Sequence, residues 1–204
     1  MERPVCKPYQ VGIFLFDEVE VLDFAGPFEV FSITETEPGM KGFQVHTVSA
    51  DGGMIRARNG LQVQPQYSFD QLPRLDLLII PGGYGAEEIE IYKPEVLNWI
   101  RSYAEAGVQI ASVCTGALLL AEAGLLDGLR ATTHWMDLKR LEEDYPHVEV
   151  QSGVKFVDQG WIVTSGGISA GIHMSLHMVG RYHGMEVAKL TAKRMEYDWE
   201  PEAE

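Results

Sequence analysis

Three short apolar runs, each followed directly by a turn and a helix-like segment, restrict the possible fold of this chain more than any other feature. They are Gln10 to Phe16 (QVGIFLF), Leu75 to Ile80 (LDLLII) and Val108 to Val113 (VQIASV). A nearly continuous apolar run predicts a strand that is buried on both faces, which is typical of parallel sheets covered by helices. Because these strands alternate with helical segments, the sequence predicts an α/β three-layer sandwich with a mostly parallel central sheet.

The remaining segments continue this alternation. Further strands are predicted at Phe43–Ser49, at Ala131–Thr133 and before Ser165, with hairpins at Met54–Gln64 and Lys155–Thr164. Helices are predicted over Asp23–Ser32 with Pro27 in the first turn, Glu95–Ala106, Ala117–Ala123 closed by Gly124, Met136–Asp144, Ser169–Tyr182 and Glu186–Met195. No repeat or linker divides the chain, so we expect one domain over residues 1–204, with a leader at 1–9 and a solvated acidic tail at 196–204.

The acidic composition excludes a general nucleic-acid surface. The chain has 16 Lys and Arg against 30 Asp and Glu, which gives a formal charge of −14, whereas phosphate binding requires clustered Lys and Arg. No segment resembles a secretory signal or a membrane span, so we expect a cytoplasmic protein with no membrane or nucleic-acid partner. Cys6 and Cys114 are too few for a disulfide framework, which favours a reducing compartment.

Cys114 is the most informative position in the chain. It ends an apolar strand and is followed by Thr115, Gly116 and a helix, a pattern typical of a nucleophile elbow. The start of a helix favours negative charge, so we expect a lowered thiol pKa and a thiolate near neutral pH. The spacing alone leaves a buried, inert cysteine as an equal alternative. Cys6, in the leader, is expected to have no catalytic role.

Ligands of parallel sheets bind beyond the carboxyl ends of the strands. Three strand ends besides that of Cys114 carry unusual residues there: Asp23, Gly82 with Gly83, and Ser165 to Ser169 (SGGIS). Asp23 follows the first strand, where it either works as a proton donor and acceptor or caps the helix. Gly82 and Gly83 follow LDLLIIP and either offer amides to a developing anion or only form a tight turn. Thr115 offers a hydroxyl and an amide to the same space, or caps locally.

Several segments together carry a family resemblance. They are FLFDEVEVLDFAGPFEVF, LLIIPGGYG, ASVCTGALLLAEAGLLDGLRATTHW and TSGGISAGI. In combination they resemble the ThiJ/PfpI superfamily from about Val11 to Met195, and each motif alone is weak. The resemblance implies a flavodoxin-like, class I glutamine amidotransferase-like fold. Within the superfamily, the pattern is most similar to that of isocyanide hydratases and of the sensor domains of AraC-type regulators.

The resemblance also implies roles for individual residues. It makes Cys114 the nucleophile and matches Asp23 to the acidic residue of the family's LDxxGP motif, which hydrogen-bonds the reactive sulfur. His134 lies in a block similar to the family's TTHP or TTHW segment, where we expect a hydrogen-bonded histidine near the cysteine. Thr115 stands where the protease-like branch has histidine, which argues against peptidase activity. His173 stands where the hydratase and regulator branches usually have aspartate, and we expect it close to the cleft.

These features favour a cysteine enzyme that needs no cofactor. It resembles isocyanide hydratase and would add water to a small electrophile, with Gly82, Gly83, His134, Ile168 and His173 contacting the substrate. The alternatives are a ligand or redox sensor like that of AraC-type regulators, although the chain ends within ten residues of its last predicted helix, and a glyoxalase-like enzyme acting on reactive carbonyls. The pair His173 and His177 lacks an acidic or cysteine partner at a matching spacing in the sequence, so no metal site is expected. The resemblance implies a homodimer.

Overall fold

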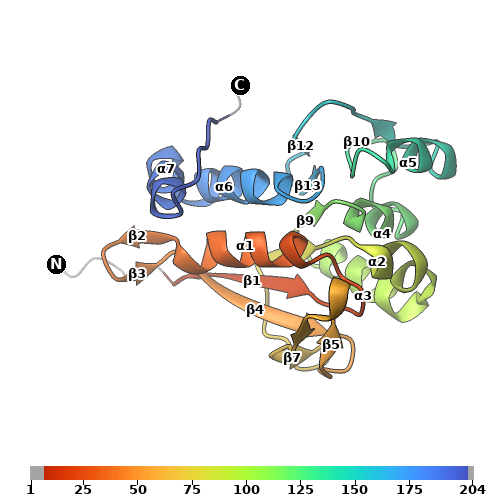
Figure 1. The fold of residues 1–204 in the computed structure, drawn as a ribbon, viewed down its shortest axis with the longest axis horizontal. Coiled ribbons are helices and arrows are strands. Elements are labelled where there is room, and N and C mark those ends of the chain that lie inside the picture. The colour runs from red at the N-terminus through yellow and green to blue at the C-terminus, as the bar shows by residue number, and fades with distance from the viewer. Residues whose placement is uncertain (1–6, 202–204) are drawn as a thin grey trace.

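A computed structural model describes residues 7–201 and shows a three-layer α/β sandwich (Figure 1). Its central sheet has seven strands in the order β12-β13-β9-β8-β1-β4-β7. The strands are β1 (Tyr9–Phe14), β4 (Phe43–Ser49), β7 (Tyr67–Ser68), β8 (Leu77–Ile80), β9 (Gln109–Val113), β12 (Phe156–Asp158) and β13 (Ile162–Ser165). All neighbours run parallel except β12 and β13. The predicted fold class is confirmed.

The centre of the sheet is buried on both faces, as the apolar runs predicted. All four residues of β8 and the last four of β9 and of β1 are buried. Their side chains point alternately to the two faces, so a strand with helices on both sides needs apolar residues at every position. This requirement explains why LLII and IASV stand in the middle of the sheet.

Helices cover both faces of this sheet. On one face α1 packs against α6, and α6 against α7, while α3 and α4 pack together on the other face (Figure 1). The helices are α1 (Val21–Ile33), α2 (Tyr84–Glu88), α3 (Pro94–Glu105), α4 (Gly116–Glu122), α5 (Leu138–Asp144), α6 (Ala170–His183) and α7 (Met185–Arg194), with short 3-10 turns at Arg58–Gly60 and Glu90–Tyr92. Within residues 7–201, none of them is both long and apolar enough to cross a membrane.

Three small ribbons lie outside the central sheet. The ribbon of β5 (Ile55–Arg56) and β6 (Gln62–Val63) confirms the hairpin predicted at Met54–Gln64. The other predicted hairpin, at Lys155–Thr164, is also confirmed, but its strands β12 and β13 belong to the central sheet. The predicted strand at Ala131–Thr133 is shorter than expected: β10 (Arg130–Ala131) pairs only with β11 (Glu149–Val150). A third ribbon, of β2 (Glu35–Glu37) and β3 (Met40–Lys41), was not predicted.

Two helix predictions were imprecise. The short helix α2 begins directly after Gly83, in a stretch where no helix was predicted. Helix α1 begins at Val21, so Pro27 lies in its second turn rather than its first. Proline lacks an amide proton, so the Asp23 carbonyl, four residues earlier, receives no helical hydrogen bond from it.

The prediction of a solvated tail is wrong for the part of it that the structure describes. Tyr197 and Trp199 pack against the hydrophobic core, and the Trp199 ring lies 6.0 Å from the His173 ring, centroid to centroid. Two aromatic rings bury enough apolar area to hold this segment against the fold although acidic residues surround them. Cys6 and most of the predicted leader, residues 1–6, fall outside the described residues.

Replacing the tail tryptophan tests this packing. We expect Trp199→Ala to lower the free energy of unfolding by about 1–3 kcal/mol, because the indole loses its contacts with the core. Tyr92→Ala is the matched control, since Tyr92 is 69% exposed and its removal opens no core contact. Denaturant unfolding followed by circular dichroism measures both, and equal stabilities for the two variants would contradict the packed tail.

Candidate active site

Cys114 lies in a strained turn between β9 and α4. Its φ angle is 57°, in the left-handed region that residues other than glycine rarely adopt. The Cys114 amide lies within hydrogen-bond range of the carbonyls of Ser165 (3.2 Å) and Gly166 (3.3 Å), and the Thr133 hydroxyl donates to the Cys114 carbonyl at 2.8 Å. These bonds hold the turn in place and confirm the elbow geometry predicted from the strand, cysteine and glycine pattern.

Asp23 lies in the first turn of α1 and is fully buried. Its Oδ2 atom accepts a hydrogen bond from the Gly82 amide at 3.1 Å. Its Oδ1 atom has no nitrogen or oxygen partner, and the side chain that interacts with the carboxyl is the Cys114 thiol. The residue that caps α1 is Glu20, without a side-chain cap bond. Asp23 therefore faces the sulfur and is not a helix cap.

The Asp23 carboxyl titrates near neutral pH. Burial raises its pKa from 3.8 to about 7, while the Gly82 amide and the Cys114 thiol lower it by less. The negative charges of Glu20 and Glu87 raise the pKa slightly further. Burial is therefore the main cause of the raised pKa. A carboxyl with such a pKa can both give and take a proton.

The predicted low pKa of the Cys114 thiol is not supported. Burial raises the thiol pKa well above its ordinary value, and the Asp23 charge raises it further. The amide and the hydroxyl of Thr115 act in the opposite direction, but their effect is smaller. At rest the proton therefore belongs on the sulfur, and a thiolate forms only when a neighbouring group removes that proton.

The turn after β8 contains Gly82 and Gly83, and a hydrogen bond joins it to Thr115, which follows β9. The Gly82 amide donates to Asp23, and the Gly83 amide donates to the Thr115 hydroxyl oxygen at 2.9 Å. Both amides are thus engaged by side chains, so the predicted oxyanion role of the two glycines is not supported. Gly83 has a φ angle of 119°, which only glycine adopts readily.

A cavity of about 410 Å³ opens above Cys114. Of the residues predicted to contact a substrate, Gly83, His134 and Ile168 line it, and Gly82 does not. The other lining residues are Glu20, Arg58, Tyr84, Glu87, Met136 and Asp137. Of these, Glu20 precedes Asp23 on the loop after the first strand, one of the strand ends where ligands of parallel sheets are expected to bind. Arg58 comes from the hairpin region, and no sequence pattern indicated it.

His134 lies beside Cys114 and close to an acidic side chain. Its Nδ1 atom is 3.5 Å from Asp137 Oδ2. A Cβ atom on Gly167 would lie 2.6 Å from His134 Cδ2 and 2.7 Å from Cys114 Sγ. The imidazole and the sulfur therefore face each other across Gly167, and a larger residue at this position would displace one of them. Gly167 was not predicted as a site residue.

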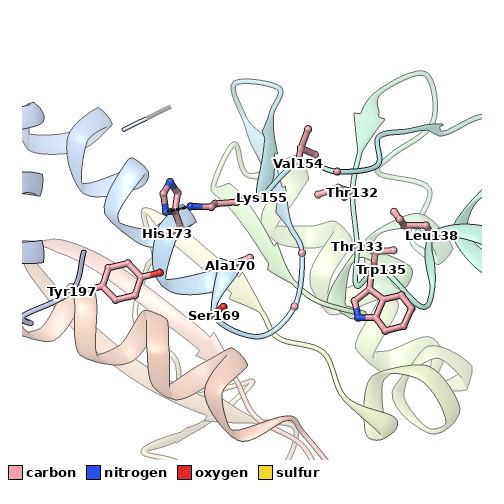
Figure 2. Close-up of a pocket in the computed structure, with 13 residues that line it drawn as sticks. Thr132, Thr133, Trp135, Leu138, Val154, Lys155, Ser169, Ala170, His173 and Tyr197 are labelled. Carbon is pink, nitrogen blue, oxygen red and sulfur yellow. Dashed lines mark hydrogen bonds between the residues drawn. The ribbon is translucent and has the colours of Figure 1, made fainter. Parts of the chain in front are cut away.

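His173 lies outside this cavity. It projects from α6 into a neighbouring pocket of about 310 Å³, which also contains Lys155 and Tyr197 (Figure 2). The side chain is 2% exposed, and burial lowers its pKa to about 4. The expectation that His173 contacts the substrate near Cys114 is therefore corrected: the loop at residues 166–169 separates the two pockets.

The described residues offer no obvious metal centre. Within residues 7–201, no group of three or more His, Cys, Asp or Glu side chains is arranged to hold a metal ion. The His177 Nε2 atom is instead bonded to Asp158 Oδ2 at 2.7 Å. Arg181 binds the same carboxylate at 3.1 Å, so this cluster is an ion-pair network.

The raised pKa of Asp23 predicts a pH-dependent stability. The folded protein holds a proton on this carboxyl between the ordinary pKa of 3.8 and about 7, and the unfolded chain does not. The stabilisation is complete below about pH 4 and is lost as the pH rises through 7. We expect the melting temperature of the wild type to fall relative to that of Asp23→Asn between about pH 5 and pH 8.

The exposed Asp127 provides the control for this comparison. Asp127→Asn should melt in parallel with the wild type over the same pH range. Parallel curves for the wild type and Asp23→Asn would show that the Asp23 pKa is not raised.

Comparisons with known proteins agree with this architecture. The profile of the DJ-1/PfpI family matches residues 9–181. The chain is 36% identical to isonitrile hydratase of Pseudomonas putida over 188 residues, which is 92% of this chain and 78% of the relative. It is 31% identical to the HTH-type transcriptional regulator GbdR of Pseudomonas aeruginosa, covering 94% of this chain and 52% of the regulator. The chain thus spans about half the length of that regulator.

A solved structure extends this likeness to three dimensions. The crystal structure of a ThiJ/PfpI family protein from Pseudomonas syringae superimposes with a TM-score of 0.82 at 27% identity, covering 98% of this chain and 79% of the other. The family profile covers more than half of the chain, and it includes the elbow, the Asp23 helix and the loop at residues 166–169. The chain belongs to the DJ-1/PfpI family.

Proposed function

We propose that this protein is a cysteine-dependent hydratase that needs no cofactor and converts an isocyanide to an N-substituted formamide. The observation that carries the proposal is the buried Asp23 carboxyl, with a pKa near 7, against the Cys114 thiol. Isocyanide hydration requires a nucleophile and a proton for the same carbon atom, and this pair supplies both. The similarity to isonitrile hydratase over most of the chain supports the same reaction.

The first step joins the sulfur to the terminal carbon of the isocyanide. As the S–C bond forms, the Asp23 carboxylate takes the thiol proton and then delivers it to that carbon. The product is a thioimidate, in which the former isocyanide carbon carries one hydrogen and is bonded to sulfur and nitrogen. The pKa values suit this order, because the resting thiol keeps its proton and a carboxyl with a pKa of about 7 can both take a proton and give it up near neutral pH.

The second step adds water to the thioimidate. One water proton goes to Asp23, the oxygen bonds to the carbon, and the second water proton passes from that oxygen to the nitrogen. The C–S bond then breaks, the sulfur recovers its proton from Asp23, and a formamide leaves. One isocyanide and one water give one formamide, so the reaction needs no oxidant or reductant. The covalent intermediate divides one difficult hydration into two easier additions.

The test is the hydration of an aryl and an alkyl isocyanide by the purified protein. We expect formamide formation by the wild type, none by Cys114→Ala, and a decrease of about 10²-fold or more in kcat for Asp23→Asn. Asp127→Asn is the matched control and should retain wild-type activity. If the wild type hydrates neither compound, or if Cys114→Ala equals the wild type, the proposed function is wrong.

A sensor is the second candidate, and the regulator match favours it. A chain that aligns over 94% of its length with half of a transcriptional regulator could share that half's ligand-sensing task. The two functions separate in one pair of measurements on the same sample. Alkylation of Cys114 by iodoacetamide without turnover of any isocyanide or reactive carbonyl favours the sensor, whereas turnover that depends on Cys114 favours the enzyme.

We further propose that the protein is a homodimer. Large apolar side chains are exposed on α1 and on the cavity wall: Leu22 and Phe28 of α1, and Ile168, which lines the cavity, are each 37–38% exposed. Exposed apolar patches commonly mark interfaces. We expect light scattering to give the mass of two chains, and the double variant Leu22→Glu and Phe28→Glu to give that of one. A monomeric wild type at micromolar concentration would contradict this proposal.

A further inference from the structure

A second pocket lies on the other side of the loop at residues 166–169 from Cys114. It has a volume of about 310 Å³. Its walls come from the segment after β10, the loop before β12, the first turn of α6 and the tail residue Tyr197 (Figure 2). None of the steps proposed for Cys114 uses it. We call it the Lys155 pocket, after the cation on its wall.

The Lys155 ammonium is directed at the His173 ring, and Figure 2 shows this contact. Its Nζ atom lies 3.2 Å from His173 Nδ1. Lysine can only donate, so Nδ1 accepts and the ring proton belongs on Nε2. Burial lowers the pKa of His173 to about 4, which keeps the imidazole neutral at physiological pH. Among the described residues, no carboxylate lies within ion-pair distance of Lys155.

Unsatisfied donors lie on the His173 ring and on Trp199, which packs against that ring and does not itself line the pocket. His173 Nε2 and Trp199 Nε1 are both buried, and neither has a partner among the described residues. The charges that act on His173 come from Lys155 and His177, and both disfavour a further positive charge. Lys155 is exposed, and no carboxylate among the described residues neutralises it, so its charge favours an electron-rich ligand on this wall.

Two hydroxyl groups complete the polar lining. In Figure 2 the Tyr197 hydroxyl points toward Ser169, and both residues line the pocket. Hydroxyl groups rotate and can donate to an acceptor placed between them. Ser169 also precedes α6, a helix of 14 residues whose first amides have no intrahelical partner.

We propose that the Lys155 pocket binds a small oxyanion, a carboxylate or a phosphate group, with Lys155 as its charge partner and the hydroxyls of Ser169 and Tyr197 as donors. A lysine is a point charge that suits either anion. A cationic ligand would meet Lys155 without a compensating carboxylate, and a wholly apolar ligand would leave the ammonium desolvated and unpaired.

A ligand in this pocket should change the surroundings of the Cys114 sulfur. Gly167 lines the Lys155 pocket, and on its other side it packs against Cys114 Sγ and His134. A Cβ atom on Gly167 would lie less than 3 Å from Cys114 Sγ and from the His134 ring, so this loop is packed tightly against both. A shift of the loop therefore changes the room around the sulfur. The oxyanion is therefore expected to change the reactivity of the thiol as well as to bind.

Calorimetric titration with inorganic phosphate and, separately, with acetate tests the binding. We expect saturable heat for at least one probe with the wild type, and affinity lower by about tenfold or more for Lys155→Gln. Lys139→Gln is the matched control, because the Lys139 side chain is 80% exposed on α5 and lies outside the pocket. Comparing the two probes distinguishes a phosphate ligand from a carboxylate ligand.

Two further variants distinguish a loss of anion binding from a folding defect. Lys155→Arg should retain binding, and Tyr197→Phe should weaken it while leaving circular dichroism unchanged. The absence of saturable binding by the wild type, or equal affinity for Lys155→Gln and the wild type, would overturn the proposal. Because calorimetry requires no turnover, a protein that hydrates no isocyanide can still bind the anion, so the two proposals fail independently.

The coupling to Cys114 has its own measurement. We expect the saturating probe to change the rate of Cys114 alkylation by iodoacetamide by about fivefold in the wild type. The same concentration should leave the rate for Lys155→Gln unchanged. Equal rates for the wild type with and without a bound probe would refute the coupling.

Discussion

Two hydrogen bonds that join the loop after β8 to its neighbours underlie the whole site. Asp23 on α1 accepts from the Gly82 amide, and Thr115 beside the nucleophile accepts from the Gly83 amide. Both amides come from one turn, so α1 and the cysteine elbow are held at fixed positions on either side of it. The turn must contain glycines, because a Cβ atom on Gly82 would lie 2.5 Å from the Thr115 nitrogen. The Asp23 carboxyl is thereby kept against the sulfur.

Burial of this pair decides which atom holds the proton. The start of a helix stabilises a thiolate by about 0.3–1 kcal/mol, and α4 has only seven residues. Each pKa unit of desolvation costs about 1.4 kcal/mol, and burial is the largest influence on both Asp23 and Cys114. Desolvation therefore outweighs the helix. The sequence placed Cys114 correctly at a helix start, but burial cannot be read from that position.

The sequence predicted the parts of the fold whose signal is local. Burial on both faces of β8 requires an unbroken apolar run, which is visible in the sequence. Parallel strands end at one edge of the sheet, so Cys114, Asp23 and Ile168 could be chosen as candidates because each follows a strand end. Other features depend on contacts between distant segments. His173 has the right spacing for the cleft, yet the loop at residues 166–169 places it in the neighbouring pocket. Trp199 packs on that histidine, although its own neighbours in sequence are acidic.

The loop at residues 166–169 separates two pockets of opposite electrostatic character. On the Cys114 side, Glu20, Glu87 and Asp137 face a single Arg58. On the other side, Lys155 has no carboxylate partner among the described residues. An anionic electrophile would be repelled from the nucleophile by these carboxylates, and the Asp23 charge adds to the repulsion above about pH 7. If Cys114 is the nucleophile, as proposed above, these acidic walls favour neutral or cationic electrophiles, and an isocyanide, which is neutral overall, can reach the sulfur without this penalty.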